Sequence, residues 1–330
     1  MSIASLHVYP VKSCAGISVE RALLTPMGLP YDRKWMIVDD STGRAVTQRT
    51  HPKMALIRAS LPPEAFTADG APPAGAALTL SAPGAPGEVR VPLAIEGRPQ
   101  LRPAKVWEWA GYAADEGDAA ADFLSAFLGK SVRLVRYLGS GADAADAAAA
   151  LAAEAIVAGG GVAGAEGAKA SLSRAVDPEF VADGEVAFAD GFPVLVACEE
   201  SLADLNTRLQ QPIPMDRFRP NIVLRGAGPA WSDDAWGGVR LGGAGVEVSL
   251  VKPCSRCTVP SVEQSTGVVT GKEPGATMMK FRSSSALGWA PRFPRNAHFF
   301  GNNGQPLGSG MLAVGEPAAV AGQVNWAAAA

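Results

Sequence analysis

The N-terminal third of the chain holds only short apolar segments separated by turn residues, and this spacing limits the possible folds most. The segment "SIASLHVYPVK" places apolar residues at Ile3, Leu6 and Val8, and "RKWMIVDD" is an apolar run that ends in an Asp/Ser/Gly turn. A third segment, "LTLSAPGAPGEVRVPL", holds two such runs around a Pro/Gly loop. Short runs bounded by Gly, Pro and Asp are typical of β-strands. Residues 1–110 are therefore predicted to be mainly β.

One helix is predicted in this half of the chain, at "DAAADFLSAFLG", before a strand at "SVRLVRY". Phe123, Leu124, Phe127 and Leu128 fall on one side of that helix, and Gly129 can end it. The Gly-Lys-Ser sequence that starts there resembles the end of a phosphate-binding loop, but Leu124 stands where such a loop needs its first glycine. We therefore interpret the glycine as the end of a helix.

Residues 139–169 form a low-complexity segment of alanine, glycine and acidic residues. The stretch "AAAALAAEAIVA" is compatible with a short helix. Its glycine-rich ends and its lack of bulky residues indicate a mobile surface insertion instead. We assign it no chemistry.

The second half of the chain combines strands with a further helix. "FPVLVACE" is predicted to be a buried strand, and "RPNIVLRG" and "GVEVSLVKP" are predicted strands joined by the loop "GAGPAWSDDAWGG". Ser201 and Asp204 resemble a capping box at the start of the helix "SLADLNTRL". The whole chain is therefore predicted to be a β-rich α+β protein in two intimately packed parts.

Composition excludes several classes of function. The 29 basic and 32 acidic residues give a formal net charge of -3 and form no long run of one sign, so neither a nucleic-acid partner nor a membrane surface is expected. The start "MSIASLHVYPVKSC" does not resemble a secretion signal, and no apolar stretch is long enough to span a membrane. Four cysteines are too few for a disulfide-rich scaffold. We expect a soluble, cytoplasmic protein.

Cys254 and Cys257, in "VKPCSRCTVP", raise the question of function. A structural zinc site needs four ligands, whereas the three histidines are scattered singly and Cys14 and Cys198 are distant in sequence. A redox dithiol sits at the start of a helix, and the "TVPSV" that follows disfavours a helix. The sequence therefore disfavours both a structural zinc site and a redox dithiol at Cys254 and Cys257.

The remaining functional interpretation is that the two cysteines are free thiols in a loop at the end of a strand. Lys252 and Arg256 flank the thiols and would favour a thiolate, which can bind a soft metal. Free cysteines that simply fill space in a core explain the pair equally well. The choice depends on other polar residues.

Three polar clusters supply that information. Lys12 and Ser13 follow the first predicted strand, Arg33 precedes another, and Arg219 and Asn221 stand two apart at a strand entry, which predicts that they share one face. Lysine, arginine, serine and asparagine suit a ligand with many acceptors, such as a phosphate or an anionic ring. Each cluster alone is more readily explained by a local ion pair or a solvated turn than by a ligand.

Taken together, these motifs resemble a known family. "VYPVKSCAG", "DRKWMIVDD", "DRFRPNIVL", "DDAW" and above all "VKPCSRCTVPSVEQSTG" are similar, in order and spacing, to molybdenum cofactor sulfurase C-terminal (MOSC) domain proteins that also carry an N-terminal MOSC β-barrel domain. The resemblance implies a MOSC β-barrel domain packed against an N-terminal β-barrel-like domain. It places the N-terminal domain at 1–138, an insertion or linker at 139–180 and the MOSC domain at 181–330.

The resemblance also implies roles for individual residues. Cys257 matches the family's molybdenum-ligating cysteine and is the expected catalytic residue, and Cys254, Ser255 and Arg256 form the loop around the pterin. The remaining expected cofactor contacts come from the family's Lys-Ser, Asp-Arg, Arg-Pro-Asn and "ADGFP" motifs, and they are Lys12, Ser13, Arg33, Arg219, Asn221, Asp190 and Gly191. The expected cofactor is molybdenum bound to molybdopterin, with pyridoxal phosphate as a further family-level expectation.

The chain looks most like the amidoxime-reducing members of this family. That resemblance implies an oxidoreductase that reduces N-hydroxylated compounds, namely hydroxylamines, amidoximes and N-hydroxylated bases, to amines. No cysteine follows Cys257, so electrons are expected from a separate flavoprotein, cytochrome b5-like or ferredoxin-like protein. The mitochondrial members' targeting segment is not seen here, in keeping with a cytoplasmic location. The alternative is a protein that carries the cofactor, or transfers its sulfur, without turnover.

Overall fold

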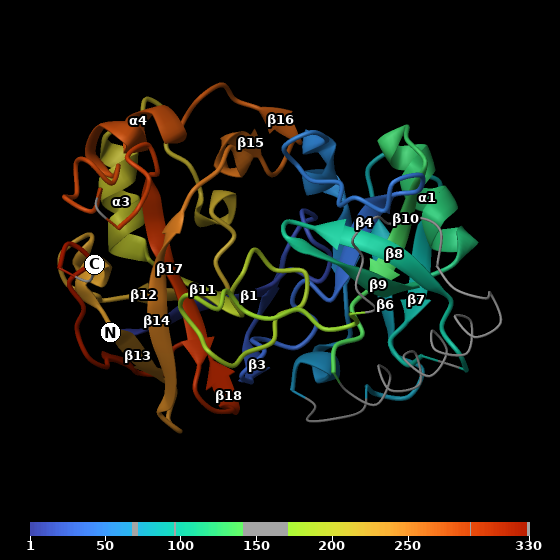
Figure 1. The fold of residues 1–330 in the computed structure, drawn as a ribbon, viewed down its shortest axis with the longest axis horizontal. Helices are drawn as coiled ribbons and strands as arrows, with labels where there is room; N and C mark the ends of the chain where they lie inside the picture. The colour runs from blue at the N-terminus through green and yellow to red at the C-terminus, as the bar shows by residue number, and fades with distance from the viewer. Residues whose placement is uncertain (68–71, 96, 141–170, 291, 329–330) are drawn as a thin grey trace.

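A single eight-stranded sheet organises one of the two lobes in this computed structural model, which describes residues 1–67, 72–95, 97–140, 171–290 and 292–328 (Figure 1). The strand order is β19-β13-β14-β17-β11-β12-β1-β2, and every pair is antiparallel except β11 with β12. Its strands are β1 (Ser2–Val8), β2 (Ile17–Val19), β11 (Val194–Cys198), β12 (Ile222–Arg225), β13 (Gly238–Leu241), β14 (Val246–Ser255), β17 (Phe299–Pro306) and β19 (Ala318–Val320).

The other lobe is built from two smaller antiparallel sheets and one helix. The first sheet has the order β4-β10-β9-β8 and the second β5-β6-β7. The bounds are β4 (Trp35–Asp39), β5 (Arg58–Ser60), β6 (Ala77–Ser81), β7 (Glu88–Pro92), β8 (Leu101–Val106), β9 (Trp109–Asp115), α1 (Asp118–Leu128) and β10 (Val132–Arg136). The β-rich α+β class predicted from the sequence is thus confirmed.

Smaller elements complete both lobes and the region between them. Two further two-stranded pairs form: β15 and β16 make a hairpin, and β3 pairs with β18 from the other end of the chain. The bounds are β3 (Arg21–Leu24), β15 (Val262–Glu263), β16 (Val268–Val269), β18 (Gly310–Ala313), α3 (Glu199–Thr207) and α4 (Gly275–Phe281), with 3-10 turns η1 (Pro52–Leu56), η2 (Pro63–Phe66), η3 (Met215–Arg217), η4 (Ser232–Ala235) and η5 (Val259–Ser261).

Each lobe has its own apolar core. Ile3, Leu6 and Val8 of β1 are fully buried among residues of the large sheet such as Val248. Leu6 and Val8 share a face because alternate residues of a strand point the same way, and the irregular register between Ile3 and Ser5 lets Ile3 face that side too. In the other lobe, Leu124 of α1 packs with residues of β4, β6 and β10. Burial of apolar surface on this scale is the main favourable term in folding. Two cores leave a polar region where the lobes meet.

The first strands of the chain lie in the lobe that holds the C-terminal elements. β1 pairs with β12, and β3 pairs with β18 near the C-terminal end of the chain. The two halves of the sequence therefore share a sheet rather than folding side by side. The division at residues 138 and 181 stays a prediction.

The predicted helix at 118–128 is confirmed, and it ends where expected. Gly129 adopts a left-handed backbone with φ of 67°, and its N–H bonds the carbonyl of Ser125. Glycine favours this conformation because it has no Cβ. The predicted insertion and its short helix fall almost wholly on residues 141–170, outside the described residues.

The predicted capping box at Ser201 and Asp204 is wrong. Helix α3 begins at Glu199, directly after the strand β11, and no side chain caps it. The Ser201 hydroxyl is buried and donates to the carboxylate of Asp233 at 2.9 Å, and Asp204 pairs with Arg208. Tertiary contacts have taken both side chains away from the backbone N–H groups that a capping box would bond.

Candidate functional site

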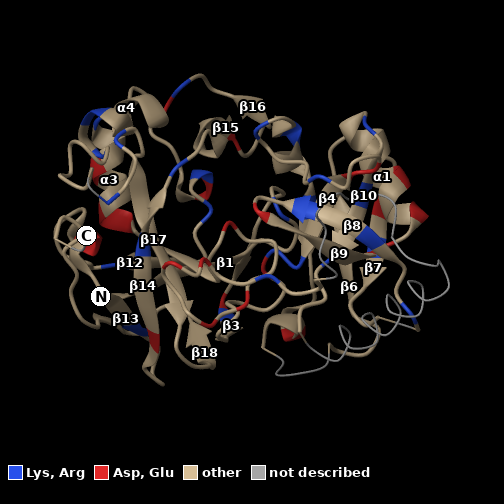
Figure 2. Ribbon diagram, in the orientation of Figure 1, with Lys and Arg blue, Asp and Glu red and all other residues tan. Residues whose placement is uncertain are grey.

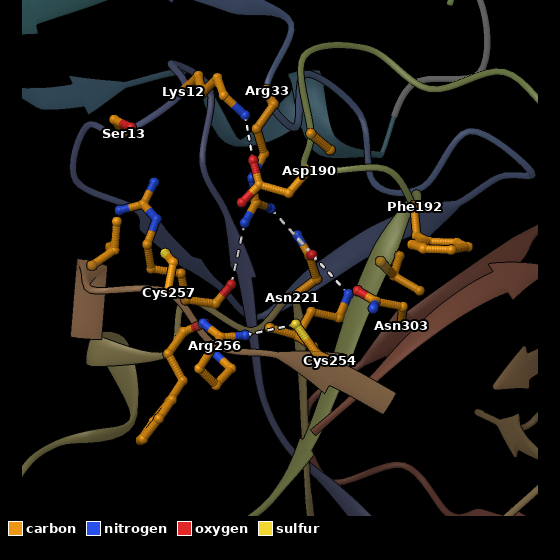
Figure 3. A pocket seen from close by; sticks show the side chains of 16 residues that line it. Lys12, Ser13, Arg33, Asp190, Phe192, Asn221, Cys254, Arg256, Cys257 and Asn303 are labelled. Carbon is orange, nitrogen blue, oxygen red and sulfur yellow. Dashed lines mark hydrogen bonds and ion pairs between the residues drawn. The ribbon is translucent and has the colours of Figure 1, made fainter. Parts of the chain in front are cut away.

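A polar pocket lies between the lobes and collects most of the predicted site residues (Figure 3). We call it the central pocket. Its lining includes Lys12, Ser13, Arg33, Asp190, Arg219, Asn221, Cys254, Arg256 and Cys257. These residues come from five separate segments of the chain, so the fold has gathered side chains that are up to 245 residues apart, from position 12 to position 257.

Lys12 ties the start of the chain to the loop before β11. Its Nζ donates to the carbonyl of Phe188 at 2.7 Å and to Asp190 Oδ1 at 2.5 Å. Burial lowers the pKa of Lys12 below its ordinary value, although the charge of Asp190 acts in the opposite direction. Desolvation likewise opposes ionisation of Asp190, but the contact with Lys12 outweighs it and lowers the pKa of that carboxyl.

Arg33 and Asn221 form a hydrogen-bonded unit in the pocket wall. Arg33 Nη1 donates to Asp32 Oδ2 at 2.5 Å and to Asn221 Oδ1 at 3.1 Å. The Asn221 oxygen also accepts from the backbone N–H of Leu195 at 3.1 Å, and its amide donates to the carbonyl of His7. Asp32 neutralises Arg33, so this unit offers fixed hydrogen-bonding geometry more than net charge.

Arg219 is the buried cation of the pocket that lacks a carboxylate partner. Its Nη1 donates to the carbonyl of Cys14 at 2.6 Å, and its buried Nη2 has no partner in the described part of the chain. The guanidinium carbons of Arg219 and Arg33 each lie 4.3 Å from the ring centroid of Tyr9. Burial raises the pKa of Tyr9 to about 12 against the effect of both arginines, so the phenol stays neutral. The pocket thus holds a buried cation that has one unpartnered nitrogen and no carboxylate partner among the described residues.

The prediction that Arg219 and Asn221 share one strand face is wrong, although both line the pocket. Strand β12 begins only at Ile222, and Arg219 has a left-handed backbone with φ of 58°. Such a φ is rare in residues other than glycine and marks a constrained turn. The two side chains reach the pocket from this turn.

The cysteine pair straddles the end of a strand. Strand β14 continues beyond its predicted end through Cys254 to Ser255, with irregular register between Leu250 and Lys252 and again between Pro253 and Ser255. Cys257 follows the strand and leads into the three-residue turn η5, so no α-helix starts at the pair. This geometry is consistent with the argument against a helix-terminal dithiol.

Arg256 is bonded to the first cysteine of the pair. Its Nη1 donates to Cys254 Sγ at 2.8 Å and its Nη2 donates to the carbonyl of Phe218 at 2.7 Å. Burial nevertheless raises the pKa of the Cys254 thiol above its ordinary value. Lys252 does not line the pocket and pairs with Asp177 at 3.0 Å. Arg256 lowers the pKa of Cys254, as expected, but burial outweighs this effect, and Lys252 is not among the groups that lower it.

Two predicted residues lie outside the central pocket. Ser255 is exposed and is aligned with Phe299 on the neighbouring strand. Gly191 lines an adjacent hollow that contains Arg174 and Asp177. Each directly follows a pocket residue, but the backbone direction carries it away from the lining.

The structure adds pocket residues that the sequence analysis missed. Phe192, Phe218 and Asn303 line the central pocket, and Figure 3 shows Phe192 and Asn303 on the side of Cys254 and Asn221. Asn303 belongs to β17, a largely buried strand that also holds the polar residues Asn302 and Gln305. Polar residues within a buried strand are the signal that could have identified it.

No group of three or more His, Cys, Asp or Glu side chains is placed to hold a metal ion within the described ranges. A metal that arrives with ligands of its own needs fewer ligands from the protein. Among the described residues, no helix is long and apolar enough to cross a membrane.

Comparison with known proteins assigns the family. The MOSC N-terminal beta barrel domain matches residues 1–131, and the MOSC domain matches residues 183–319. The mouse mitochondrial amidoxime-reducing component 1 is 31% identical over 98% of this chain and 83% of its own length. The chain belongs to the MOSC family. The resemblance seen in the sequence is thus confirmed.

Other members of the family give the same result over most of the chain. The bovine mitochondrial amidoxime reducing component 2 is 29% identical over 85% of this chain and 72% of its own length. The human mitochondrial amidoxime-reducing component 1 is 29% identical over 98% of this chain and 83% of its own length. This MOSC protein is therefore a distant homologue of both components over nearly its full length.

Proposed function

We propose that this MOSC protein is a molybdenum-cofactor-dependent reductase that converts N-hydroxylated compounds to the parent amines. The named activity of its relatives, the reduction of amidoximes, supports this choice of reaction. The chain covers most of their length, so both domains of the relatives have a counterpart here.

One observation carries the proposal: the half-buried thiol of Cys257 lines the same pocket as the buried, unpartnered guanidinium nitrogen of Arg219. Nε of Arg256 is buried without a partner as well. A buried cation with free donors is costly unless an anion meets it. The donor set of the pocket therefore fits an anionic group that also carries a soft metal.

The pocket residues divide into two groups by the part of the cofactor that each would hold. Cys257 would supply the thiolate ligand to molybdenum, because a soft metal prefers sulfur. The cofactor contacts predicted from the sequence would meet the phosphate and the pterin ring, and within the pocket they are Lys12, Ser13, Arg33, Asp190, Arg219, Asn221, Cys254 and Arg256. When bound, the cofactor supplies the redox chemistry that accepts an oxygen atom from nitrogen.

Hydrogen bonds and ion pairs within the chain orient the side chains of the central pocket and set its charge. Arg256 holds the Cys254 thiol and the Phe218 carbonyl in place, beside the expected metal ligand. Asp32 fixes Arg33, and Lys12 fixes Asp190 at the pocket wall. Overall, the N-hydroxylated compound takes up two electrons and two protons and yields an amine and water. A separate electron-donor protein would supply the electrons.

The test uses protein purified from a host that makes molybdenum cofactor. Reduction of benzamidoxime to benzamidine is followed with dithionite-reduced methyl viologen as the electron donor. We expect turnover in the wild type and none in Cys257→Ala. Molybdenum-loaded wild-type protein that reduces neither benzamidoxime nor hydroxylamine would contradict the proposal and favour a cofactor carrier.

A further inference from the structure

A second hollow adjoins the central pocket and shares Cys257 and Arg256 with it. We call it the hairpin hollow because residues of the β15–β16 hairpin line it. It encloses about 650 Å³, within the range of sites for small molecules. It therefore gives a ligand a second approach to the expected metal ligand.

The hairpin spans the two lobes, as Figure 1 shows for β15 and β16. Gln264 of the hairpin loop accepts a hydrogen bond from Gln48 Nε2 at 3.1 Å, and that nitrogen also donates to the carbonyl of Ser13. Strands β15 and β16 pack against η1 of the other lobe. These contacts hold the hairpin against the other lobe, and of the residues that make them Gln48 lines the hollow.

The walls of the hairpin hollow are partly apolar. Val262 of β15 and Val269 of β16 line it, and Val269 is 51% exposed. An exposed apolar side chain that faces a hollow gains free energy when a ligand covers it. These walls suit an aromatic or aliphatic body.

The charged lining of the hairpin hollow is entirely basic. Arg49 and Lys272 join Arg256 in the lining, and no Asp or Glu lines the hollow among the described residues. Arg49 stacks on the ring of Trp107, with its guanidinium carbon 4.5 Å from the centroid. Neither Arg49 nor Lys272 forms an ion pair with a described carboxylate. Figure 2 shows Lys and Arg on loops of both lobes in the region below β15 and β16.

The nearby polar groups do not cancel this charge. Asp190 feels the charge of Arg49 but already binds Lys12 at 2.5 Å. His298 also lines the hollow, and its buried Nδ1 has no partner within the described ranges. Burial and then the charge of Arg256 lower the pKa of His298, so its ring is neutral at pH 7. The hollow thus presents two cations that have no carboxylate partner in the described part of the chain, beside an uncharged imidazole.

We infer that the hairpin hollow is the substrate subsite and that it selects N-hydroxylated compounds with an apolar body and a terminal carboxylate or phosphate. This inference rests on the proposed function, because the N-hydroxylated end must reach the Cys257 side of the hollow. Arg49 and Lys272 bind the anionic end, and the exposed side chain of Val269 covers the body. The cations act as specificity residues and take no part in the reduction.

The test compares benzamidoxime with 4-carboxybenzamidoxime, which differ by one carboxylate. Binding to the oxidised holoenzyme is measured by calorimetry, and kcat/KM is measured with reduced methyl viologen. We expect 4-carboxybenzamidoxime to bind about tenfold more tightly than benzamidoxime, a difference that two exposed ion pairs can supply. This preference should fall as salt is added, because salt screens exposed charges. The same preference is expected in kcat/KM.

The variant Arg49→Gln/Lys272→Gln removes both cations, and Arg90→Gln/Lys280→Gln is its matched control. Arg90 and Lys280 are exposed and lie outside the hollow, so the control loses the same charge elsewhere. The first variant should lose the preference and reduce benzamidoxime at the wild-type rate, whereas the control should keep the preference.

Equal affinity of the wild type for both compounds, or a preference that survives in Arg49→Gln/Lys272→Gln, would overturn the inference. If neither compound is reduced, the proposed function fails and the role as a substrate subsite fails with it. In that case, tighter binding of the carboxylate that depends on both cations would still identify the hollow as an anion site.

Discussion

Arg256 donates a hydrogen bond from Nη1 to the sulfur of Cys254, 2.8 Å away, while Cys257 lies beyond the end of the same strand. The two cysteines therefore have different surroundings despite their spacing. Cys254 is held by a guanidinium and its thiol pKa is raised by burial. This asymmetry predicts different roles for the two thiols.

Cys254→Ala should leave the molybdenum content within about twofold of the wild type, because a protonated thiol is a poor metal ligand. The lost contact frees Arg256 Nη1, so activity should fall more than metal content does. Metal analysis and kcat on the same preparation measure both quantities. A Cys254→Ala protein without metal would show that both thiols are ligands.

Arg219→Met should weaken cofactor retention at least about tenfold, because it removes a charged donor from the pocket. In the cofactor-free protein, the same change should raise the free energy of unfolding by about 1 kcal/mol, because a buried cation beside Arg33 is no longer desolvated. Urea unfolding and molybdopterin content measure the two effects.

Arg225→Met is the matched control for this prediction, since Arg225 is exposed at the end of β12. It should change neither quantity. If Arg219→Met destabilises the cofactor-free protein and leaves cofactor content unchanged, then Arg219 is structural and the site assignment is wrong.

The titration of Asp233 should make the free energy of unfolding depend on pH. Its buried carboxyl has a pKa raised to about 6 by burial and by the charge of Asp234. The folded state therefore binds this proton more tightly than the unfolded state, whose pKa lies near 4. This contribution to stability is present at acid pH and is lost as pH rises through about 6, with a change of about 2 kcal/mol between pH 4 and pH 7.

Asp233→Asn removes this titration. The difference in unfolding free energy between the wild type and Asp233→Asn should shift by about 2 kcal/mol in favour of the variant from pH 4 to pH 7. Urea unfolding at several pH values measures it. A difference that does not change with pH would contradict the raised pKa.

Gly28 occupies a position where we expect that an added methyl group is not tolerated. Its φ is +96°, and a Cβ there would lie 2.5 Å from the carbonyl oxygen of Pro193, next to the strand β11. Gly28→Ala should cost more than about 2 kcal/mol, from the clash together with backbone strain. Gly84→Ala, with φ of +74° and open space around it, should cost only about 1 kcal/mol. Equal losses in the two variants would contradict the close approach.

The sequence could predict the local elements because their signals are local. The strand at Trp35–Asp39 and the helix that ends at Gly129 follow from apolar spacing and one glycine. The capping box failed because the partner of Ser201 is Asp233, far along the chain. The pairing of β1 with β12 is a long-range contact of the same kind, and no local pattern encodes it.

Most of the candidate site was predicted through motifs whose residues the fold brings together, such as Lys12, Arg33 and Cys257. The contacts among these site residues could not be predicted from the sequence. The left-handed turn at Arg219 and the extension of β14 through Cys254 depend on packing between segments. Asn303 carried only a weak signal, three polar residues in a largely buried strand.

The most direct test is the molybdenum content of wild-type protein, Cys257→Ala and Cys254→Ala, each purified from one host that makes the cofactor. We predict about one molybdenum per chain in the wild type and in Cys254→Ala, and little in Cys257→Ala, because a single thiolate holds the metal. Molybdenum absent from the wild type despite a verified cofactor supply, or equal in the wild type and Cys257→Ala, would contradict the central claim.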